Sequence, residues 1–214
     1  SIWGKFNWLK AYFTPIKEND IVTGSNIVLD DITEKKKSEY DLKEKVFRDP
    51  LTKAYNRHAL DNKLFDRLSE VKLKGMISCI AIVDIDNFKD INDTFGHKAG
   101  DSVLKYLATR AKKELREDDL LIRTGGDEFL IYLHNIRDEK NALNLIKRIF
   151  EKISGGYRLT DDDNNEPYKI NVSCSIGTSF FPRDGDRVEA LMAKADRSLY
   201  KVKNSGKAGF NIED

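Results

Sequence analysis

Residues 123–129 read Arg-Thr-Gly-Gly-Asp-Glu-Phe and lie between two apolar runs, 119–122 and 129–133. Two short apolar runs around a pair of glycines predict a β-hairpin. Adjacent glycines adopt backbone angles closed to other residues, so this turn can be sharp and can approach a bulky polyphosphate. The pattern places two acids, Asp127 and Glu128, at the tip. Taken alone, it also fits an ordinary exposed hairpin whose acids only keep it soluble.

Length and composition predict a folded chain without a strong charge bias. The 214 residues, 40% of them hydrophobic, suffice for one full domain and part of a second. The 37 Lys and Arg nearly balance the 36 Asp and Glu, so nucleic acid is not an expected partner, and a DNA-binding regulator is disfavoured. Cys79 and Cys174 lie in apolar runs and are expected to be buried hydrophobes, not a disulfide or a zinc site.

No apolar run reaches the roughly 20 residues that a membrane-spanning helix needs, and no signal-peptide pattern follows Ser1. We therefore expect no membrane segment in this chain and a cytoplasmic location. A membrane tether further upstream in a longer protein is compatible with that expectation.

Residues 1–32 predict two strands, 8–13 and 27–32, with a polar turn near Asn19 and Asp20 between them. Two strands alone do not make a core.

A charged helix is expected to follow, ending near Arg48. Asp31 and Glu34 have the spacing of a capping box, with Asp31 as the N-cap. Apolar positions are sparse in this helix, so it either packs against a partner helix or is a solvated linker. Asp49 precedes a proline and leaves the α region, so a new domain is expected to begin there.

Beyond residue 49 the apolar periodicity alternates between helix and strand, which predicts an α/β fold of the mixed α+β kind. The expected helices are 57–73, 99–115, 140–153 and 188–203, and the expected strands outside the hairpin are 77–83 and 170–180. The polar stretches 160–166 and 182–186 are expected to be surface loops.

The predicted strand 77–83 runs directly into Asp84-Ile85-Asp86. A hard cation such as Mg²⁺ needs only one or two carboxylates when substrate phosphates supply further oxygens. If this strand pairs beside the hairpin, Asp84 and Asp127 converge into a metal site. Alone, the three residues fit a strand-ending turn equally well.

The segment from Asp84 to Asp101 resembles the signature Asp-Ile-Asp-x-Phe-Lys-x-Ile-Asn-Asp-x-x-Gly-His-x-x-Gly-Asp of the GGDEF family, the diguanylate cyclases. Further blocks match in order: Asp49-Pro50-Leu51-Thr52 with Asn56-Arg57, then 123–129, Ser175-Ile176-Gly177, and Ala195-Asp196 through Leu199-Tyr200 and Lys203. Together they cover about residues 49–210. Chance does not supply five ordered blocks, so the hairpin is identified as the family's signature turn.

The resemblance implies a palm-like central sheet flanked by helices, similar to nucleotide cyclases and polymerases, over residues 49–214. It also implies an enzyme that condenses two GTP into cyclic di-GMP and releases two pyrophosphates. Each domain holds one GTP, so the active form is expected to be a homodimer.

The same resemblance assigns the metal and catalytic residues. Asp84, the backbone carbonyl of Ile85, Asp127 and Glu128 would bind Mg²⁺ or Mn²⁺, with two ions in each half-site. Asp127 would also serve as the base for the attacking hydroxyl, helped by Glu128. Lys89 matches a lysine that stabilises charge developing on the phosphates.

Substrate binding is implied for a further set of residues: Phe88, Asn92, Asp101, Gly125, Gly126, Lys203 and Lys207. Asn92 and Asp101 would read guanine, since a carboxylate accepts from two guanine donors that adenine lacks. Structural alternatives are a helix cap for Asn92 and an N-cap for Asp101. Lys207 stands where the family commonly has arginine, and lysine loses the two-pronged grip. Thr124 replaces a common aromatic, a change expected to affect local packing and not chemistry.

Arg116 and Asp119 match the family's Arg-x-x-Asp inhibitory motif, which binds the product cyclic di-GMP. A polar turn between a helix and a strand is the alternative. Upstream, Asp31-Ile32-Thr33 resembles the end of a PAS sensor domain, which would make 1–32 its C-terminal remnant and 33–48 a signalling helix. The rival function is a non-enzymatic GGDEF module that binds GTP or cyclic di-GMP as a signalling receptor.

Overall fold

The computed structural model describes residues 7–160 and 167–211 and divides the chain into two units, Ser1–Phe47 and Arg48–Asp214. The first unit contains an antiparallel pair, β1 (Leu9–Glu18) and β2 (Ile21–Asp31), followed by helix α1 (Thr33–Val46). The predicted turn is confirmed, with Asn19 and Asp20 both left-handed at φ 48° and 62°. The strands are longer than predicted, because pairing continues on both sides of the turn.

The predicted capping box at the start of α1 is wrong. Strand β2 continues to Asp31, which pairs with Leu9, so the helix begins two residues later and Ile32 takes the N-cap position. The Asp31 carboxylate accepts a hydrogen bond from the Thr33 N–H at 2.9 Å instead.

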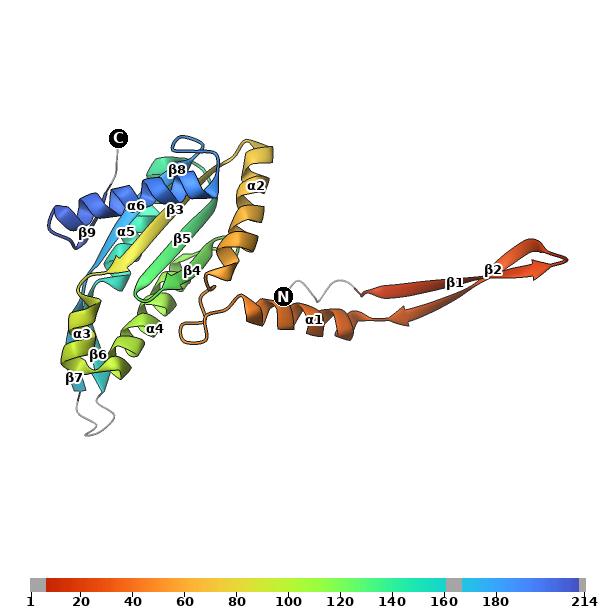
Figure 1. Cartoon of the computed structure of the whole chain (residues 1–214), viewed down its shortest axis with the longest axis horizontal. Helices are drawn as coiled ribbons and strands as arrows, with labels where there is room; N and C mark the ends of the chain where they lie inside the picture. Colours follow the sequence, from red (N-terminus) through yellow and green to blue (C-terminus); the bar gives the residue numbers. More distant parts are fainter. Residues whose placement is uncertain (1–6, 161–166, 212–214) are drawn as a thin grey trace. The chain divides into compact units, whose positions relative to one another are not determined.

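The second unit is built on a five-stranded sheet in the order β4-β5-β3-β8-β9 (Figure 1). Its strands are β3 (Ile77–Ile85), β4 (Leu120–Gly125), β5 (Glu128–Ile136), β8 (Cys174–Phe181) and β9 (Gly209–Asn211). All neighbours are antiparallel except β8 and β9, which are parallel. Its helices are the π-helical turn η2 (Leu60–Leu64), α2 (Phe65–Lys74), α3 (Phe88–Phe95), α4 (His97–Glu114), α5 (Glu139–Ile153) and α6 (Val188–Asn204).

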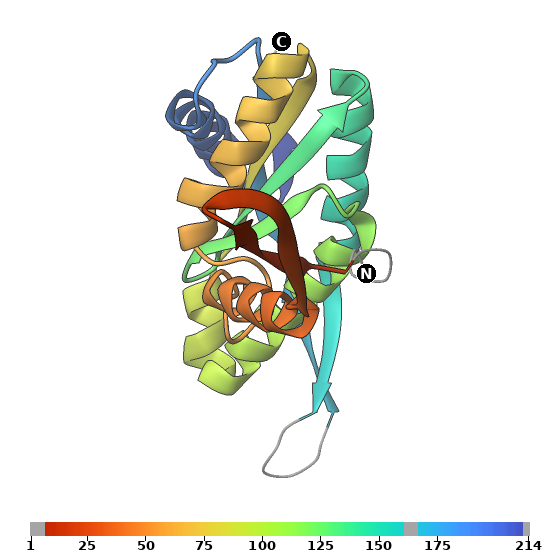
Figure 2. The same ribbon diagram turned by 90° about the vertical axis from the view of Figure 1, so that its right-hand side faces the viewer.

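Helices cover both faces of this sheet. Helices α2 and α6 lie against one face, and α4 and α5 against the other (Figures 1 and 2). Ala81 and Val83 of β3 belong to the core shared with α4 and α5. Ile80 and Ile82 are equally buried, and their side chains alternate to the opposite face. A strand buried on both faces needs a continuous apolar run, which explains the sequence before Asp84.

Close packing of α6 on β8 depends on Gly177. A Cβ at this position would lie 2.1 Å from the Leu199 nitrogen and 2.2 Å from the Ala195 carbonyl oxygen. Both contacts are with helix backbone, which cannot move aside cheaply. The matched blocks around residues 177 and 195–199 are therefore two sides of one contact.

The mixed α/β fold with a sheet flanked by helices is confirmed, but two element predictions need correction and one strand was not predicted. The predicted strand 170–180 is two strands, β7 (Pro167–Val172) and β8, and β7 pairs with β6 (Gly155–Thr160) in a separate ribbon (Figure 2). The chain breaks at Ser173, whose carbonyl accepts the Asp86 N–H at 2.9 Å. The predicted helix 99–115 begins at His97 and has α3 before it, and β9 was not predicted.

Other predictions concern the loops and the cysteines. The loop predicted over 160–166 lies, apart from Thr160, outside the described residues. Cys79 and Cys174 are free and buried, as expected. None of the helices in the described ranges has the length and apolar character needed to cross a bilayer.

Candidate active site

The candidate acids meet where the central strand β3 ends and the neighbouring strand β5 begins. Strand β3 pairs antiparallel with β5, and Asp84 stands opposite Glu128 in the register. Asp127 immediately precedes Glu128 in the turn between β4 and β5. The pairing expected of strand 77–83 and the hairpin is therefore present, and it brings acids from distant parts of the sequence together.

Asp84 is partly buried and lies among charged side chains of both signs. Burial raises the pKa of its carboxyl above the usual value, and the negative charges of Asp127 and Asp86 add to that rise. The Lys203 ammonium opposes the rise, with its Nζ 2.8 Å from Asp84 Oδ2. Lys203, predicted to grip a triphosphate, thus contacts the first candidate metal ligand. The cluster attracts cations, because clustered carboxylates are stabilised by positive charge.

The donor set fits a hard divalent cation. Asp84 and Asp127 are oxygen donors close enough to repel each other electrostatically, and Ile85 adds a backbone carbonyl next to Asp84. Among the described residues, no three or more His, Cys, Asp or Glu side chains are grouped so that they could hold a metal ion, so Asp84, Asp127 and Glu128 do not form a ready cluster. The pair Asp84 and Asp127 suits an ion that takes one or two carboxylates together with substrate phosphates.

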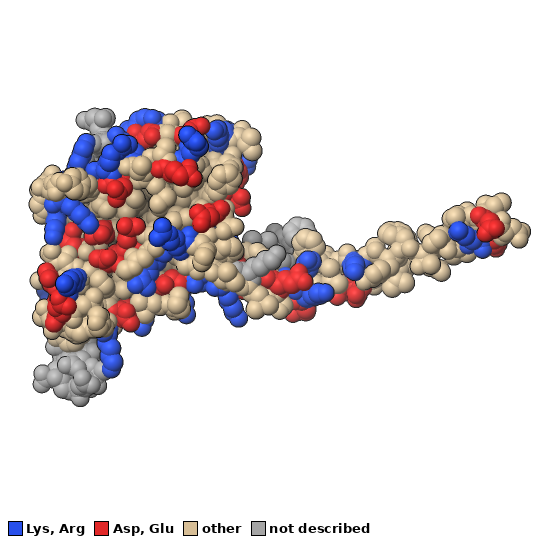
Figure 3. Space-filling model, in the orientation of Figure 1, with Lys and Arg blue, Asp and Glu red and all other residues tan. Residues whose placement is uncertain are grey.

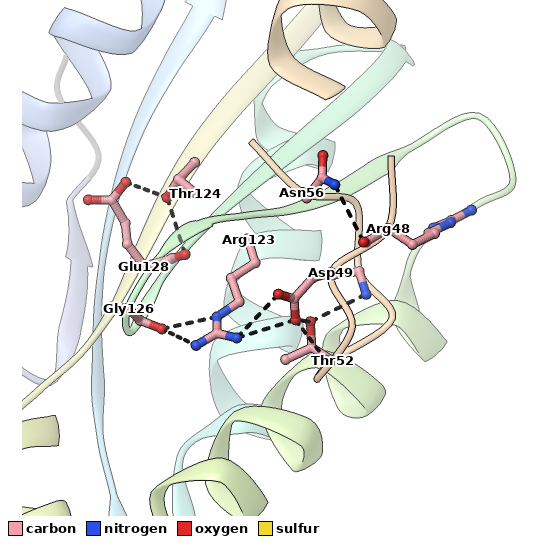
Figure 4. Close-up of polar contacts among 9 residues, drawn as sticks. Arg48, Asp49, Thr52, Asn56, Arg123, Thr124, Gly126 and Glu128 are labelled. Atoms are coloured by element: carbon pink, nitrogen blue, oxygen red, sulfur yellow. Dashed lines mark hydrogen bonds and ion pairs between the residues drawn. The ribbon is translucent and has the colours of Figure 1, made fainter. Parts of the chain in front are cut away.

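The signature turn is anchored by Arg123. Its Nε and Nη2 donate to the Gly126 carbonyl at 3.0 and 2.7 Å, and its Nη1 lies 3.3 Å from Asp49 Oδ1 (Figure 4). Gly126 is left-handed at φ 48°, a conformation that favours glycine. Asp49 in turn accepts from the backbone N–H and the hydroxyl of Thr52, both at 2.7 Å. The first turn of the second unit is thus joined directly to the tip of the hairpin.

The expectation that Thr124 affects only local packing is incomplete. Its hydroxyl lies 2.5 Å from Glu128 Oε1 and 3.2 Å from the Glu128 carbonyl oxygen (Figure 4). An aromatic side chain offers no hydroxyl at this distance from the backbone. The residue that departs from the family pattern therefore contacts a candidate catalytic acid.

The candidate guanine residues lie on α3 and α4, next to the acids in sequence. A Cβ on Gly100 would stand 2.0 Å from Asn92 Oδ1 and 3.1 Å from the Phe88 ring. The absence of a side chain at residue 100 therefore lets Asn92 and Phe88 lie directly against the helix turn that carries Asp101. Neither cap alternative holds, because Asn92 lies inside α3 and Asp101 lies inside α4.

Lys89 and Lys207 are both exposed. Lys89 occupies the first turn of α3. Lys207 follows α6 in a left-handed conformation, φ 62°, and its Nζ donates to Asn87 Oδ1 at 2.7 Å. Its ammonium is therefore held by Asn87, which follows the end of β3 and is three residues after Asp84.

Arg116 and Asp119 lie beside a separate cavity of about 610 Å³. Asp119 is buried, and its two carboxylate oxygens accept the backbone N–H groups of Arg116 and His134, each at 2.9 Å. These bonds support the alternative of a structural turn for Asp119. The exposed Arg116 and Arg148 of α5 line the cavity.

Sequence reasoning missed Asp86 as a structural centre of the site. It is 5% exposed and accepts hydrogen bonds from Ser173, Ser175 and Ala208. The sequence signal for this role was its place two residues after Asp84, but its hydrogen-bond partners lie far away along the chain.

Charges of both signs are interspersed on the face of the second unit drawn in Figure 3, with no basic stripe across it. This face offers no continuous track for a nucleic-acid backbone.

The family model for "Diguanylate cyclase, GGDEF domain" matches residues 46–209. The probable diguanylate cyclase DgcT of Escherichia coli (strain K12) is 35% identical over 167 residues, 78% of this chain and 36% of that protein. The response regulator PleD of Caulobacter vibrioides (strain NA1000 / CB15N) is 37% identical over 159 residues, 74% of this chain and 34% of that protein. The chain thus spans about a third of the length of these two curated relatives.

Solved structures agree with the sequence relatives. The GGDEF domain of TpbB from Pseudomonas aeruginosa has a TM-score of 0.69 and 32% identity, covering 75% of this chain and 91% of that one. DgcB from Caulobacter crescentus, solved with c-di-GMP, has a TM-score of 0.69 and 26% identity, covering 83% and 91%. With residues 46–209 matched and the signature acids gathered where β3 ends and β5 begins, the chain belongs to the GGDEF family of diguanylate cyclase domains.

Proposed function

We propose that the chain condenses two GTP into cyclic di-GMP with release of two pyrophosphates, as a homodimer in which each protomer holds one GTP. The observation that carries the proposal is the register of β3 and β5, which sets Asp84 opposite Glu128 and beside Asp127. Acids gathered at the ends of two paired strands, next to a glycine turn, can bind the metal ions that accompany a charged triphosphate.

Each half-reaction is a phosphoryl transfer. The 3′-hydroxyl of one GTP attacks the α-phosphate of the other, a new O–P bond forms, and the bond to pyrophosphate breaks. The hydroxyl proton passes to a carboxylate, for which Asp127 is our candidate and Glu128 its helper. Repeating the step in the opposite direction closes the ring. The protein contributes mainly positioning, because both nucleotides must be aligned across the two protomers.

Mg²⁺ or Mn²⁺ fits the oxygen donors of Asp84, Ile85, Asp127 and Glu128, with two ions per half-site. When bound, the ions would neutralise triphosphate charge and lower the pKa of the attacking hydroxyl. Lys89, Lys203 and Lys207 add positive charge for the phosphates. Lys203 already lies 2.8 Å from Asp84, so this lysine links the metal ligands to the phosphate-binding residues.

Guanine selection is assigned to Asp101 and Asn92. The carboxylate would accept from both donors of the guanine edge, and Asn92 would add an amide contact. Gly100 supports this reading, because its missing side chain leaves the Asn92 amide against the Asp101 turn.

Product inhibition is assigned to the 610 Å³ cavity lined by Arg116 and Arg148. Guanidinium groups bind phosphates and guanine edges through paired hydrogen bonds. Asp119 would hold the turn that presents Arg116, in keeping with its bonds to backbone N–H groups. We expect Arg116→Ala to leave the initial rate unchanged and to let cyclic di-GMP accumulate beyond the level at which the parent stalls.

The decisive test is incubation of the purified chain with GTP and Mg²⁺, followed by chromatography for cyclic di-GMP. Asp127→Ala should make no product, and Asp61→Ala, an exposed acid in η2, should retain the parent rate. A parent chain that binds GTP or cyclic di-GMP without making product would support the rival signalling module instead.

For the first unit, we propose that 1–32 is the end of a PAS-like sensor and 33–48 a signalling helix. The support is the strand pair followed directly by α1, together with the Asp31-Ile32-Thr33 resemblance. The family match itself begins at residue 46.

A further inference from the structure

A buried carboxylate joins three separate segments next to the candidate site. Asp86 follows β3 and is 5% exposed. Its Oδ1 accepts from the Ser175 hydroxyl at 2.7 Å, and its Oδ2 accepts from the Ser173 hydroxyl at 2.9 Å. The same Oδ2 accepts from the backbone N–H of Ala208 at 3.0 Å. The two serines are at the start of β8, whereas Ala208 belongs to the loop after α6.

That loop has an unusual backbone. Lys207 and Ala208 are consecutive non-glycine residues in the left-handed region, at φ 62° and 50°. Such a conformation is unfavourable for an L-residue with a Cβ, because the Cβ crowds the following carbonyl oxygen. It persists only where surrounding contacts determine it. The Lys207 N–H bonds to the Val202 carbonyl at 3.2 Å, and the Ala208 N–H bonds to Asp86.

The tip of Lys207 is held by the residue next to Asp86. Asn87 Oδ1 accepts from the Lys207 ammonium at 2.7 Å. Two consecutive residues after β3 therefore fix Lys207 at both ends. Asp86 holds the loop backbone through Ala208, and Asn87 holds the ammonium. The loop is exposed, so these bonds replace the packing that would otherwise define it.

We propose that Asp86 is a positioning residue for the triphosphate of the substrate: by holding the Ala208 N–H it sets the left-handed loop that presents Lys207. The inference rests on the proposed function, in which Lys207 binds GTP phosphates. Asp86 acts through Lys207 and needs no contact of its own with the nucleotide.

A general structural role predicts a different pattern of effects. Losing a bond to Ser173 or Ser175 would loosen the start of β8 and lower stability without regard to the ligand. Losing the bond to Ala208 would weaken only ligands that carry the distal phosphates. The nature of the ligand therefore separates the two roles.

The test is calorimetric binding of GMP and of a GTP analogue with a non-cleavable α,β bridge, both with Mg²⁺, to the full chain. We expect Asp86→Ala to weaken analogue binding about tenfold while GMP affinity stays within about twofold. Asp86→Asn keeps an acceptor oxygen for Ala208 and should retain most of the analogue affinity. The matched control is Ser175→Ala, because the Ser175 hydroxyl bonds to Asp86 Oδ1 and not to the oxygen that holds Ala208. This variant should lower the melting temperature without a selective loss of affinity for the analogue.

Coupling to Lys207 gives a second criterion. If Asp86 acts through this lysine, Asp86→Ala should weaken analogue binding no further in a Lys207→Ala background. Additive losses, or equal losses for the analogue and GMP, would overturn the positioning role. A parent that binds GMP but shows no added affinity for the analogue would overturn it as well, and with it the phosphate role of Lys207. Asp101→Ser should weaken both ligands, which tests the guanine assignment separately.

Amide hydrogen exchange of the parent keeps the inference testable if Asp86→Ala does not fold. The Ala208 N–H should exchange much more slowly than an unstructured amide at the same pH, since it is bonded to a buried carboxylate. Exchange at the rate of a free loop would contradict the tether.

Discussion

At residue 124 a hydroxyl contacts an acid of the signature turn, at a position where the family often has an aromatic side chain. We expect Thr124→Val, which keeps the shape and removes the hydroxyl, to lower kcat about tenfold through looser orientation of Glu128. Thr124→Ser keeps the donor and should retain most of the parent rate. Initial rates of cyclic di-GMP formation and a thermal melt of each variant check this. A valine variant with the parent kcat would show that the hydrogen bond does not affect turnover.

The proposed selection of guanine also belongs to the residue scale. We expect Asp101→Ser to reduce the preference for GTP over ATP, because a hydroxyl cannot accept from both guanine donors at once, a loss of roughly 1.5–3 kcal/mol. Competition between the two nucleotides in a binding assay measures the change. Asp93→Ser, an exposed acid on α3, is the control. Unchanged discrimination in Asp101→Ser would assign guanine reading to other residues.

At the scale of elements, the periodic helices and the hairpin could be predicted because their signals are local. Helix α5 and the strand pair β4–β5 lie close to their predicted bounds. Strand β9 could not be predicted, since its three residues are stabilised by pairing with β8, a strand distant in sequence. The break between β7 and β8 likewise depends on Asp86, which bonds to Ser173 from 87 positions away.

The candidate site divides in the same way. Its acids and its candidate guanine-binding residues belong to contiguous sequence motifs, so the family resemblance could identify them. The contacts that organise them, such as Asp49 with Arg123, join residues 74 positions apart and depend on the folded chain. Family resemblance gave a position for Thr124 but could not give its hydrogen bond, because the usual residue there is aromatic.

The Asp49–Arg123 pair links two elements and should make stability depend on pH. Burial opposes ionisation of Asp49, but bonds from Thr52 and the Arg123 guanidinium outweigh it and hold the pKa of the Asp49 carboxyl below its usual value. A carboxyl with a lowered folded-state pKa contributes stability above its unfolded pKa, about 3.9, and loses it as pH falls through the folded value.

We therefore expect Asp49→Asn to lower the free energy of unfolding by about 1–3 kcal/mol at pH 7 and to approach the parent below about pH 4. Urea denaturation at a series of pH values measures both curves. Asp186→Asn breaks an exposed pair with Lys72, side chains 63% and 54% exposed, and should change the free energy of unfolding much less than Asp49→Asn does. A constant gap between Asp49→Asn and the parent across the acid range would refute the charge contribution of this pair.

At the scale of the whole molecule, the two units differ in what stabilises them. The second unit has a core between sheet and helices, whereas every described side chain of β1 and nearly all of β2 is exposed. A two-stranded hairpin is marginally stable in water on its own. We expect residues 48–214 alone to unfold cooperatively with a melting temperature within about 4 °C of the full chain's main transition. Residues 1–47 alone should show no cooperative transition by circular dichroism, and a sharp one would contradict this division.

The exposed hairpin also affects how self-association of the chain must be interpreted. Leu9 and Phe13 of β1 and Ile27 and Leu29 of β2 leave 56–67% of their surface in water. Both strands are also edge strands, which are open to pairing with another chain. Light scattering on the full chain would therefore sum any association through these apolar strands and the proposed dimerisation through the second unit. Only the proposed dimer should respond to guanine nucleotides, so nucleotide dependence, and not particle mass, is the measurement that tests for it.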